Sequence, residues 1–198
     1  MKKKNGISIA MFLALMFVFL NFISMPVWAG PGDVAIDATN FPAENFRNYV
    51  STKFDTNNDG ILSQDELDVV TEIKLYNVEI NDLKGVEHFK KLERLECEFC
   101  SMTNLDVTKN VNLKELDCSG NKLNTLDVTK NVNLEKLSCY NNELNILDVT
   151  KNVNLKELNC SYNKINTLDV TKNPKLKILY LSHIFQGYYY EVFNLDVS

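Results

Sequence analysis

A 21-residue period runs through the second half of this chain and restricts what it can fold into. The hexapeptide Leu-Asp-Val-Thr-Lys-Asn begins at Leu105, Leu126, Leu147 and Leu168, so its copies are 21 residues apart. Each copy follows a run in which leucines and a cysteine alternate with polar residues. A unit this short cannot bury its own apolar face, so successive copies must stack and share one continuous core.

The consensus of the period is L-x-x-L-x-C-x-x-N-x-L-x-x-L-D-V-T-K-N-x-x. It matches the leucine-rich repeat, in which a short strand is followed by a return arc. We therefore predict an α/β solenoid over residues 71–198: a right-handed leucine-rich-repeat stack of about six coils with a parallel sheet. The first coil is offset by 22 residues, and its arc at residues 83–91 is expected to hold a helical turn. The last coil is degenerate after Leu181.

Two polar or thiol side chains recur with the repeat. An asparagine follows each strand, and its carboxamide is expected to hydrogen-bond to backbone groups of neighbouring coils. A cysteine points inward in each strand and is expected to behave as a small buried hydrophobe. Disulfides or a stack of metal ligands stay open as alternatives for the cysteines. Cys100 takes the place of Asn121 and is the candidate for a free, reactive thiol. The asparagines are Asn121, Asn142 and Asn163, and the cysteines are Cys97, Cys118, Cys139 and Cys160.

Alternation along each strand divides its residues between the core and the concave face of the solenoid. In the third coil, Leu116 and Cys118 point inward, whereas Glu115 and Asp117 point outward. Solenoids bind partners on this face, and tyrosines are frequent anchors in interfaces. We expect a protein or cell-surface ligand to contact six outward residues: Tyr76, Glu96, Asp117, Tyr140, Glu157 and Tyr180. The alternative is a solvated sheet face without a partner.

Residues 55–66 have the sequence of a complete EF-hand loop. Phe46, Val50 and Phe54 recur at helical spacing before the loop, and a second, short helix is expected after it. Gly60 permits the sharp turn that such a loop needs. Ca²⁺ is a hard cation that takes oxygen ligands. The predicted ligands are the side chains of Asp55, Asn57 and Asp59, the carbonyl of Ile61, Ser63 through water, and both carboxylate oxygens of Glu66.

The alternative for this loop is an acidic helix cap and turn that binds no metal. Extracellular loops of this type bind calcium weakly, with dissociation constants of roughly 0.1–1 mM. A single loop fits a structural ion better than a sensor. We therefore expect Ca²⁺ to stabilise residues 30–70 as a helical cap, which covers the edge of the first strand.

The first 29 residues differ in composition from the rest of the chain. Lys2, Lys3 and Lys4 precede a nearly unbroken apolar run over residues 7–23, and Ala29 follows Pro26 at a position suited to signal peptidase. This pattern predicts a secretory signal that is cleaved after Ala29. An uncleaved membrane anchor is the alternative, since the run approaches the length that spans a bilayer. Cleavage would leave a secreted or surface-associated protein with no membrane contact of its own.

The arrangement resembles the internalin-type leucine-rich-repeat proteins of bacteria, in which an EF-hand-like helical cap leads directly into the repeats. The matching residues run from Phe41-Pro42, through Leu83-Lys84-Gly85-Val86-Glu87, to the coil that starts at Leu92. The resemblance implies a cap over residues 30–70 joined to the solenoid. This sequence differs in its full set of loop ligands, its smaller number of repeats and its C-terminal residues, which match no wall anchor. The binding of host receptors by internalins is therefore not expected of this chain.

Charge and chemistry narrow the function. Without Lys2, Lys3 and Lys4, 26 acidic residues face 18 basic ones, a net charge of −8, and an acidic chain repels nucleic-acid phosphates. His88 and His183 lie in no catalytic pattern, so we predict that the chain is not an enzyme. The predicted function is that of a secreted, calcium-binding protein that binds a protein or cell-surface ligand through the concave sheet, with the ion stabilising the cap and changing partner affinity little. The alternative is a structural envelope protein that self-associates through the last coil, near Tyr188, Tyr189 and Tyr190.

Overall fold

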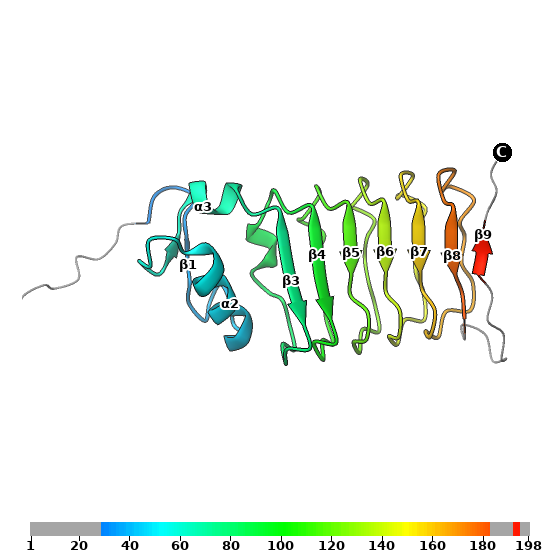
Figure 1. Ribbon diagram of the computed structural model, residues 1–198, viewed down its shortest axis with the longest axis horizontal. Coiled ribbons are helices and arrows are strands. Elements are labelled where there is room, and N and C mark those ends of the chain that lie inside the picture. The colour runs from blue at the N-terminus through cyan, green and yellow to red at the C-terminus, as the bar shows by residue number, and fades with distance from the viewer. Residues whose placement is uncertain (1–28, 183–191, 195–198) are drawn as a thin grey trace, which may run out of the picture.

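The computed structural model describes residues 29–182 and 192–194. A row of strands lies side by side, with a small helical unit at the N-terminal end (Figure 1). Residues 1–28 of the predicted signal segment lie outside the described residues, as do His183 and the three tyrosines at 188–190. Across the described part of the chain, no helix is both long and apolar enough to cross a bilayer.

In the described part of the chain the sheet has seven strands, and the first six are parallel and bound five complete turns of the solenoid. They are β3 (Glu72–Tyr76), β4 (Arg94–Glu98), β5 (Glu115–Asp117), β6 (Lys136–Ser138), β7 (Glu157–Asn159) and β8 (Ile178–Tyr180). The register equals the repeat: Leu95 pairs with Leu116, and Leu116 with Leu137. The return arc of a sixth coil would fall on residues 183–191, outside the described part. β9 (Val192–Asn194) pairs antiparallel with β8.

The core is a set of ladders that run through all the coils. The predicted burial of the four repeated cysteines is confirmed: their side chains are fully buried, and their thiols are free. The Sγ atoms of Cys97 and Cys118 donate to carbonyl oxygens of the next strand, on Asp117 at 3.4 Å and Ser138 at 3.5 Å. Burial raises the pKa of the Cys118 thiol far above its usual value.

The Cys100 thiol is free, as predicted, but its burial makes it a poor candidate for the reactive thiol. Its side chain is fully buried, and its Sγ donates to the carbonyl oxygen of Glu98 at 3.3 Å. Burial raises the pKa of the Cys100 thiol. The chain turns inward at this point, so the position belongs to the core whether it holds an asparagine or a cysteine.

The asparagine ladder forms as predicted. The Oδ1 atom of Asn121 accepts backbone N–H groups from Cys100 and Met102, each at 3.0 Å. Its Nδ2 donates to the carbonyls of Cys97 at 2.8 Å and Cys118 at 2.9 Å. One buried side chain therefore joins two coils, and the asparagines at 142 and 163 repeat the arrangement.

The cap is built from α2 (Glu44–Phe54), α3 (Gln64–Asp68) and a two-stranded sheet of β1 (Val34–Ala35) and β2 (Ile61–Leu62). Phe41, which is fully buried, joins the cap to the first coil. Its ring centroid lies 5.9 Å from that of Phe46 and 6.4 Å from that of Phe89. Gly85 has a φ of 107°, and a Cβ there would lie 2.3 Å from Phe41 Cδ1, so only glycine fits. The predicted helical turn in the first arc is η1 (Val86–His88).

Candidate functional site

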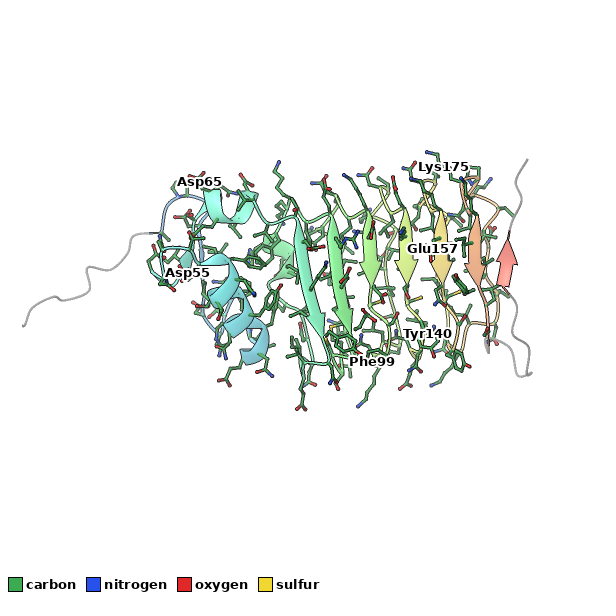
Figure 2. All side chains as sticks on the ribbon, in the orientation of Figure 1. Asp55, Asp65, Phe99, Tyr140, Glu157 and Lys175 are labelled. Carbon is green, nitrogen blue, oxygen red and sulfur yellow. The ribbon has the colours of Figure 1, made fainter. Side chains whose placement is uncertain are left out.

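A groove of about 430 Å³ runs across the outward face of the sheet, and we call it the sheet groove. Its polar lining comes from β4 to β8: Arg94, Glu96, Glu115, Asp117, Lys136, Ser138, Glu157, Asn159 and Tyr180. Figure 2 places Glu157 on this face. Four of the six predicted partner-binding residues therefore meet in one groove, namely Glu96, Asp117, Glu157 and Tyr180.

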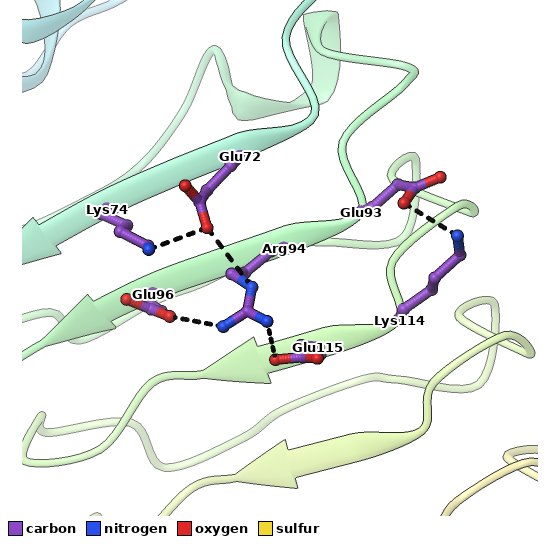
Figure 3. Close-up of polar contacts among 7 residues, drawn as sticks. All are labelled: Glu72, Lys74, Glu93, Arg94, Glu96, Lys114 and Glu115. Atoms are coloured by element: carbon purple, nitrogen blue, oxygen red, sulfur yellow. Dashed lines mark hydrogen bonds and ion pairs between the residues drawn. The ribbon is translucent and has the colours of Figure 1, made fainter.

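An ion-pair network centred on Arg94 joins the first three strands of the sheet (Figure 3). Its guanidinium lies 3.4 Å from Glu72, 3.1 Å from Glu96 and 2.7 Å from Glu115. Lys74 also pairs with Glu72, at 2.9 Å. These side chains are partly exposed, and such pairs contribute at most about 1 kcal/mol each. Their main effect is to orient the side chains and to neutralise Arg94.

The sheet groove keeps an excess of negative charge. Its lining contains two cations, Arg94 and Lys136, against four carboxylates, and Arg94 is already shared among three acids. Glu98 lies at the end of β4 beside this cluster. Burial, followed by repulsion from Asp117 and Glu96, raises the pKa of the Glu98 carboxyl. Both facts indicate a surface that favours cations.

Tyr76 and Tyr140, the other two predicted partner-binding residues, lie outside the sheet groove. Each packs edge to face against an aromatic ring of the next coil: Tyr76 on Phe99 at 5.8 Å and Tyr140 on Tyr162 at 5.2 Å between centroids. We call these four residues the aromatic rim. Phe99 and Tyr140 both lie toward the C-terminal ends of the strands in Figure 2. The repeat pattern did not identify Phe99 or Tyr162 as candidates.

One repeat position, shortly past the end of the strand, has a left-handed backbone in five successive coils. These residues are Asn77, Phe99, Gly120, Asn141 and Tyr162, with φ between 52° and 68°. Glycine and asparagine adopt this conformation readily, whereas other L-residues are destabilised there by roughly 1–2 kcal/mol. Asn, Gly and Asn occupy three of the five positions, and this pattern could have marked the aromatic residues at the other two as unusual.

The cap loop positions several of the predicted calcium ligands. Asp55 directly follows α2 and is almost fully buried. Its two carboxylate oxygens accept the backbone N–H groups of Asp59 at 3.1 Å and Gly60 at 3.0 Å. Gly60 has a φ of 81°, as the sharp turn requires. Asp59 accepts from the Nδ2 of Asn57 at 2.9 Å and from the backbone N–H of Ile61 at 2.8 Å.

Glu66 closes the loop through hydrogen bonds. Its Oε1 accepts the backbone N–H and hydroxyl of Thr56, at 2.7 and 2.6 Å, and its Oε2 accepts those of Ser63, at 2.9 and 2.8 Å. Burial raises the pKa of the Glu66 carboxyl, but these hydrogen bonds outweigh burial and lower it to about 2. Ser63 and Glu66 together form the capping box of α3.

The residue types of the loop suit a calcium ion, but the present positions of their side chains do not form a complete site. Its donors are oxygens, as calcium requires, and they lie on one short loop. Within residues 29–182, however, no three His, Cys, Asp or Glu side chains converge as a metal site would need. Glu66 faces Thr56 and Ser63, so coordination by Glu66 would compete with four existing hydrogen bonds.

A second groove, of about 740 Å³, lies along the return arcs. Its carboxylates already have partners. The Oδ1 of Asp127 accepts the hydroxyl of Thr129 at 2.6 Å and its backbone N–H at 2.9 Å. The same turn recurs at Asp106, Asp148 and Asp169. These aspartates stabilise the arcs, and the sheet groove remains the better candidate for a binding surface.

Comparisons with known proteins agree with this fold. No protein-family model matches the chain. Internalin J of Listeria monocytogenes serotype 4b (strain F2365) is 36% identical over 70 residues, which are 35% of this chain and 8% of that protein. The functional domain of InlJ from Listeria monocytogenes, which includes a cysteine ladder, is 31% identical with a TM-score of 0.63. That match covers 76% of this chain and 38% of that one.

Two further solved structures have the same fold. A leucine-rich-repeat protein of Leptospira interrogans is 27% identical with a TM-score of 0.56, over 59% of this chain and 32% of that one. The internalin InlF of Listeria monocytogenes is 17% identical with a TM-score of 0.65, over 82% and 47%. The chain spans less than half the length of each of these relatives. It is therefore similar to the internalins, with the leucine-rich-repeat fold of proteins that are typically non-enzymatic binders.

Proposed function

We propose that this chain is a non-enzymatic binding protein that holds a protein partner against the outward face of its sheet. The observation that carries the proposal is the sheet groove, which crosses five strands and gathers Glu96, Asp117, Glu157 and Tyr180 in one place. The internalin-like fold supports it, because such solenoids present this face to proteins. The groove is polar and rigidly positioned, since every strand is held by its neighbours.

A capture experiment tests this proposal. The full chain, immobilised on beads, is compared with Glu157→Lys combined with Tyr180→Ala, which alters the groove without touching the core. Lys172→Ala on an exposed arc is the control. We expect the groove variant to lose the captured protein and the control to retain it. Equal capture by all three would contradict a role for this face.

Secretion is part of the same proposal. The lysines at 2–4, the apolar run and Ala29 support an export signal, and the likeness to internalins loosely supports an extracellular or surface location. Mass spectrometry of the protein from the culture medium is expected to find Gly30 as its first residue. A protein that retains residues 1–29 in the membrane fraction would support the anchor instead.

We also propose that the cap loop binds one Ca²⁺ ion with a structural role. The support is the oxygen donor set, together with Asp55, which is already held at the centre of the loop by Asp59 and Gly60. The antiparallel pairing of β2 with β1 fixes the other side of the loop. Because Glu66 must exchange its bonds to Thr56 and Ser63, binding is expected to be weak.

Calorimetry separates this proposal from a metal-free turn. The full chain is expected to release or absorb heat on binding Ca²⁺, and Asp55→Ala and Glu66→Ala should abolish this signal. Asp65→Asn, which changes an exposed acid beside Glu66 on α3, should retain it. Thr56→Val removes one competing hydroxyl and is expected to tighten binding. If wild type and Asp55→Ala give the same signal, the loop is a helix cap and turn only.

Self-association through the last coil has less support. At that end of the sheet, β9 of the same chain already pairs with β8. Light scattering of the full chain tests it, and a stable oligomer would favour this alternative.

A further inference from the structure

We propose that the aromatic rim, with the carboxylates beside it, is the docking edge for an extended basic segment of the protein partner. The rim consists of Tyr76, Phe99, Tyr140 and Tyr162, as defined above. This inference rests on the proposed function, because it names the chemistry of the partner and the edge of the sheet that recognises it.

The rim has a regular geometry. Tyr76 and Phe99 belong to the first two coils, and Tyr140 and Tyr162 hold the same repeat positions in the fourth and fifth. The coil between the pairs carries Gly120, where a Cβ would lie 2.4 Å from Phe99 Cδ1. Equivalent residues of the two pairs are three strand spacings apart, about 14 Å, which is about four residues of an extended chain.

The fold does not require these rings. Asn77 and Asn141 occupy the same left-handed position as Phe99 and Tyr162, so the turn forms without an aromatic side chain. Two of the four rings are exposed, Tyr76 by 67% and Phe99 by 42%, whereas Tyr140 and Tyr162 are half-buried. Phe99 has a left-handed backbone and nevertheless remains exposed, so its ring contributes more to contact with another molecule than to the core.

Charge beside the rim selects a cation. Glu96, Glu98 and Asp117 lie close enough together to repel one another. Arg94 pairs with Glu96, but it is shared with Glu72 and Glu115. A guanidinium or ammonium group from a partner can neutralise these carboxylates and also pack on a ring of the rim. An extended segment with several Arg or Lys residues can contact the carboxylates and the aromatic rings at the same time.

A peptide-binding experiment with the full chain tests this inference. The probe is a fluorescein-labelled peptide of about nine residues that alternates Arg and Ser, long enough to reach both aromatic pairs. The rim variant combines Phe99→Asn with Tyr162→Asn, which introduces the residue that other coils use at this position. Val111→Asn is the control, because Val111 is exposed to a similar degree, 47%, outside the rim.

We expect the rim variant to bind the Arg peptide about tenfold more weakly, with an unchanged or higher melting temperature. The control variant should bind as wild type does, and a peptide with Glu in place of Arg should not bind. Glu98→Gln with Asp117→Asn should also weaken binding and reduce its dependence on salt.

Other outcomes overturn the inference. One such outcome is a rim variant that binds the Arg peptide as tightly as wild type, while the groove variant Glu157→Lys with Tyr180→Ala still loses the captured protein. This would contradict the role of the rim but leave the proposed function supported. If the groove variant also still captures the protein, both the role of the rim and the proposed function are contradicted. If the rim variant loses binding of a neutral hexasaccharide rather than of the Arg peptide, the rim is a sugar site and the proposal is wrong.

Discussion

The cap and the repeat stack share one continuous core, but they are stabilised in different ways. In the stack, each coil repeats the contacts of the coil before it, as Asn121 and Asn142 show. In the cap, each contact occurs once: Phe41 packs against Phe46 of the cap and Phe89 of the first coil, and Phe54 packs against Phe89 from the end of α2. A destabilising substitution in the cap should therefore affect only the cap and the first coil. A destabilising substitution in a middle coil should instead disrupt the contacts between the coils on either side of it.

Loss of Phe41 should have the largest effect. Phe41→Ala removes a fully buried ring and is expected to lower the free energy of unfolding by about 3–5 kcal/mol in urea titrations. Hydrogen exchange should become faster in β3 than in β7, because only the first coil loses its cover. Val69→Ala, which truncates an exposed side chain, should change stability by less than about 0.5 kcal/mol. Equal loss of protection in β3 and β7 would erase the distinction between cap and stack.

Removal of one ladder asparagine should come next. Asn142→Ala leaves the N–H of Leu123 and the carbonyls of Cys118 and Cys139 without this partner, at a cost of about 2–3 kcal/mol. Asn145→Ala, on an exposed side chain of the same coil, is the control. If the coils are equivalent, Asn121→Ala should cost the same within about 1 kcal/mol. A large difference in urea midpoints between these two ladder variants would show that the coils are not equivalent.

Calcium should have a smaller effect, confined to the cap. With a dissociation constant of about 1 mM, 10 mM Ca²⁺ stabilises the bound state by about 1.4 kcal/mol. Exchange should slow in the loop and in β3 more than in β7, and Glu66→Ala should abolish the change. Calcium protection that is strongest in β7 would place the ion elsewhere.

Acid should weaken the arcs slightly. Hydrogen bonds from the Thr129 hydroxyl and N–H lower the pKa of Asp127, and the same cause acts at Asp106, Asp148 and Asp169. Because each folded pKa lies below the unfolded value of about 3.9, this stabilisation is full above that pH and is lost as the pH falls toward the folded pKa.

Melting curves measured from pH 6 downward check the acid effect. Thr129→Val should flatten the decline, whereas Thr167→Val, which precedes the same turn in a later coil, should leave it unchanged. A decline that starts well above pH 5 would point to another group.

The repeat predicted most of the stack because its period fixes the register. Leu95, Leu116 and Leu137 are paired as a shift of 21 residues requires. The period could not predict β1 or β9, since each is a short segment whose only signal is a partner distant in sequence. Nor could it show that Cys100 is buried, because burial there depends on how sharply the chain turns.

The candidate sites were predictable only in part. Alternation placed Glu96, Asp117 and Glu157 on one face, and the structure gathers them in one groove. It could not separate Tyr76 and Tyr140 from that groove: Tyr76 lies on β3, which does not line the groove, and Tyr140 lies past the end of β6. Likewise, the loop sequence shows that Glu66 offers oxygens to a metal, but not that Thr56 and Ser63 already donate to them.

The ladder of asparagines makes the length of this molecule adjustable. In the coils of Asn121, Asn142 and Asn163, each asparagine donates to the same carbonyl of the coil before it. A block of 21 residues can therefore be inserted or deleted among these coils, and the asparagine bonds on either side of it form again. Each such event would move the cap and the last strand apart or together by one step of about 4.8 Å, so the chain can act as a ruler whose gradations are whole coils.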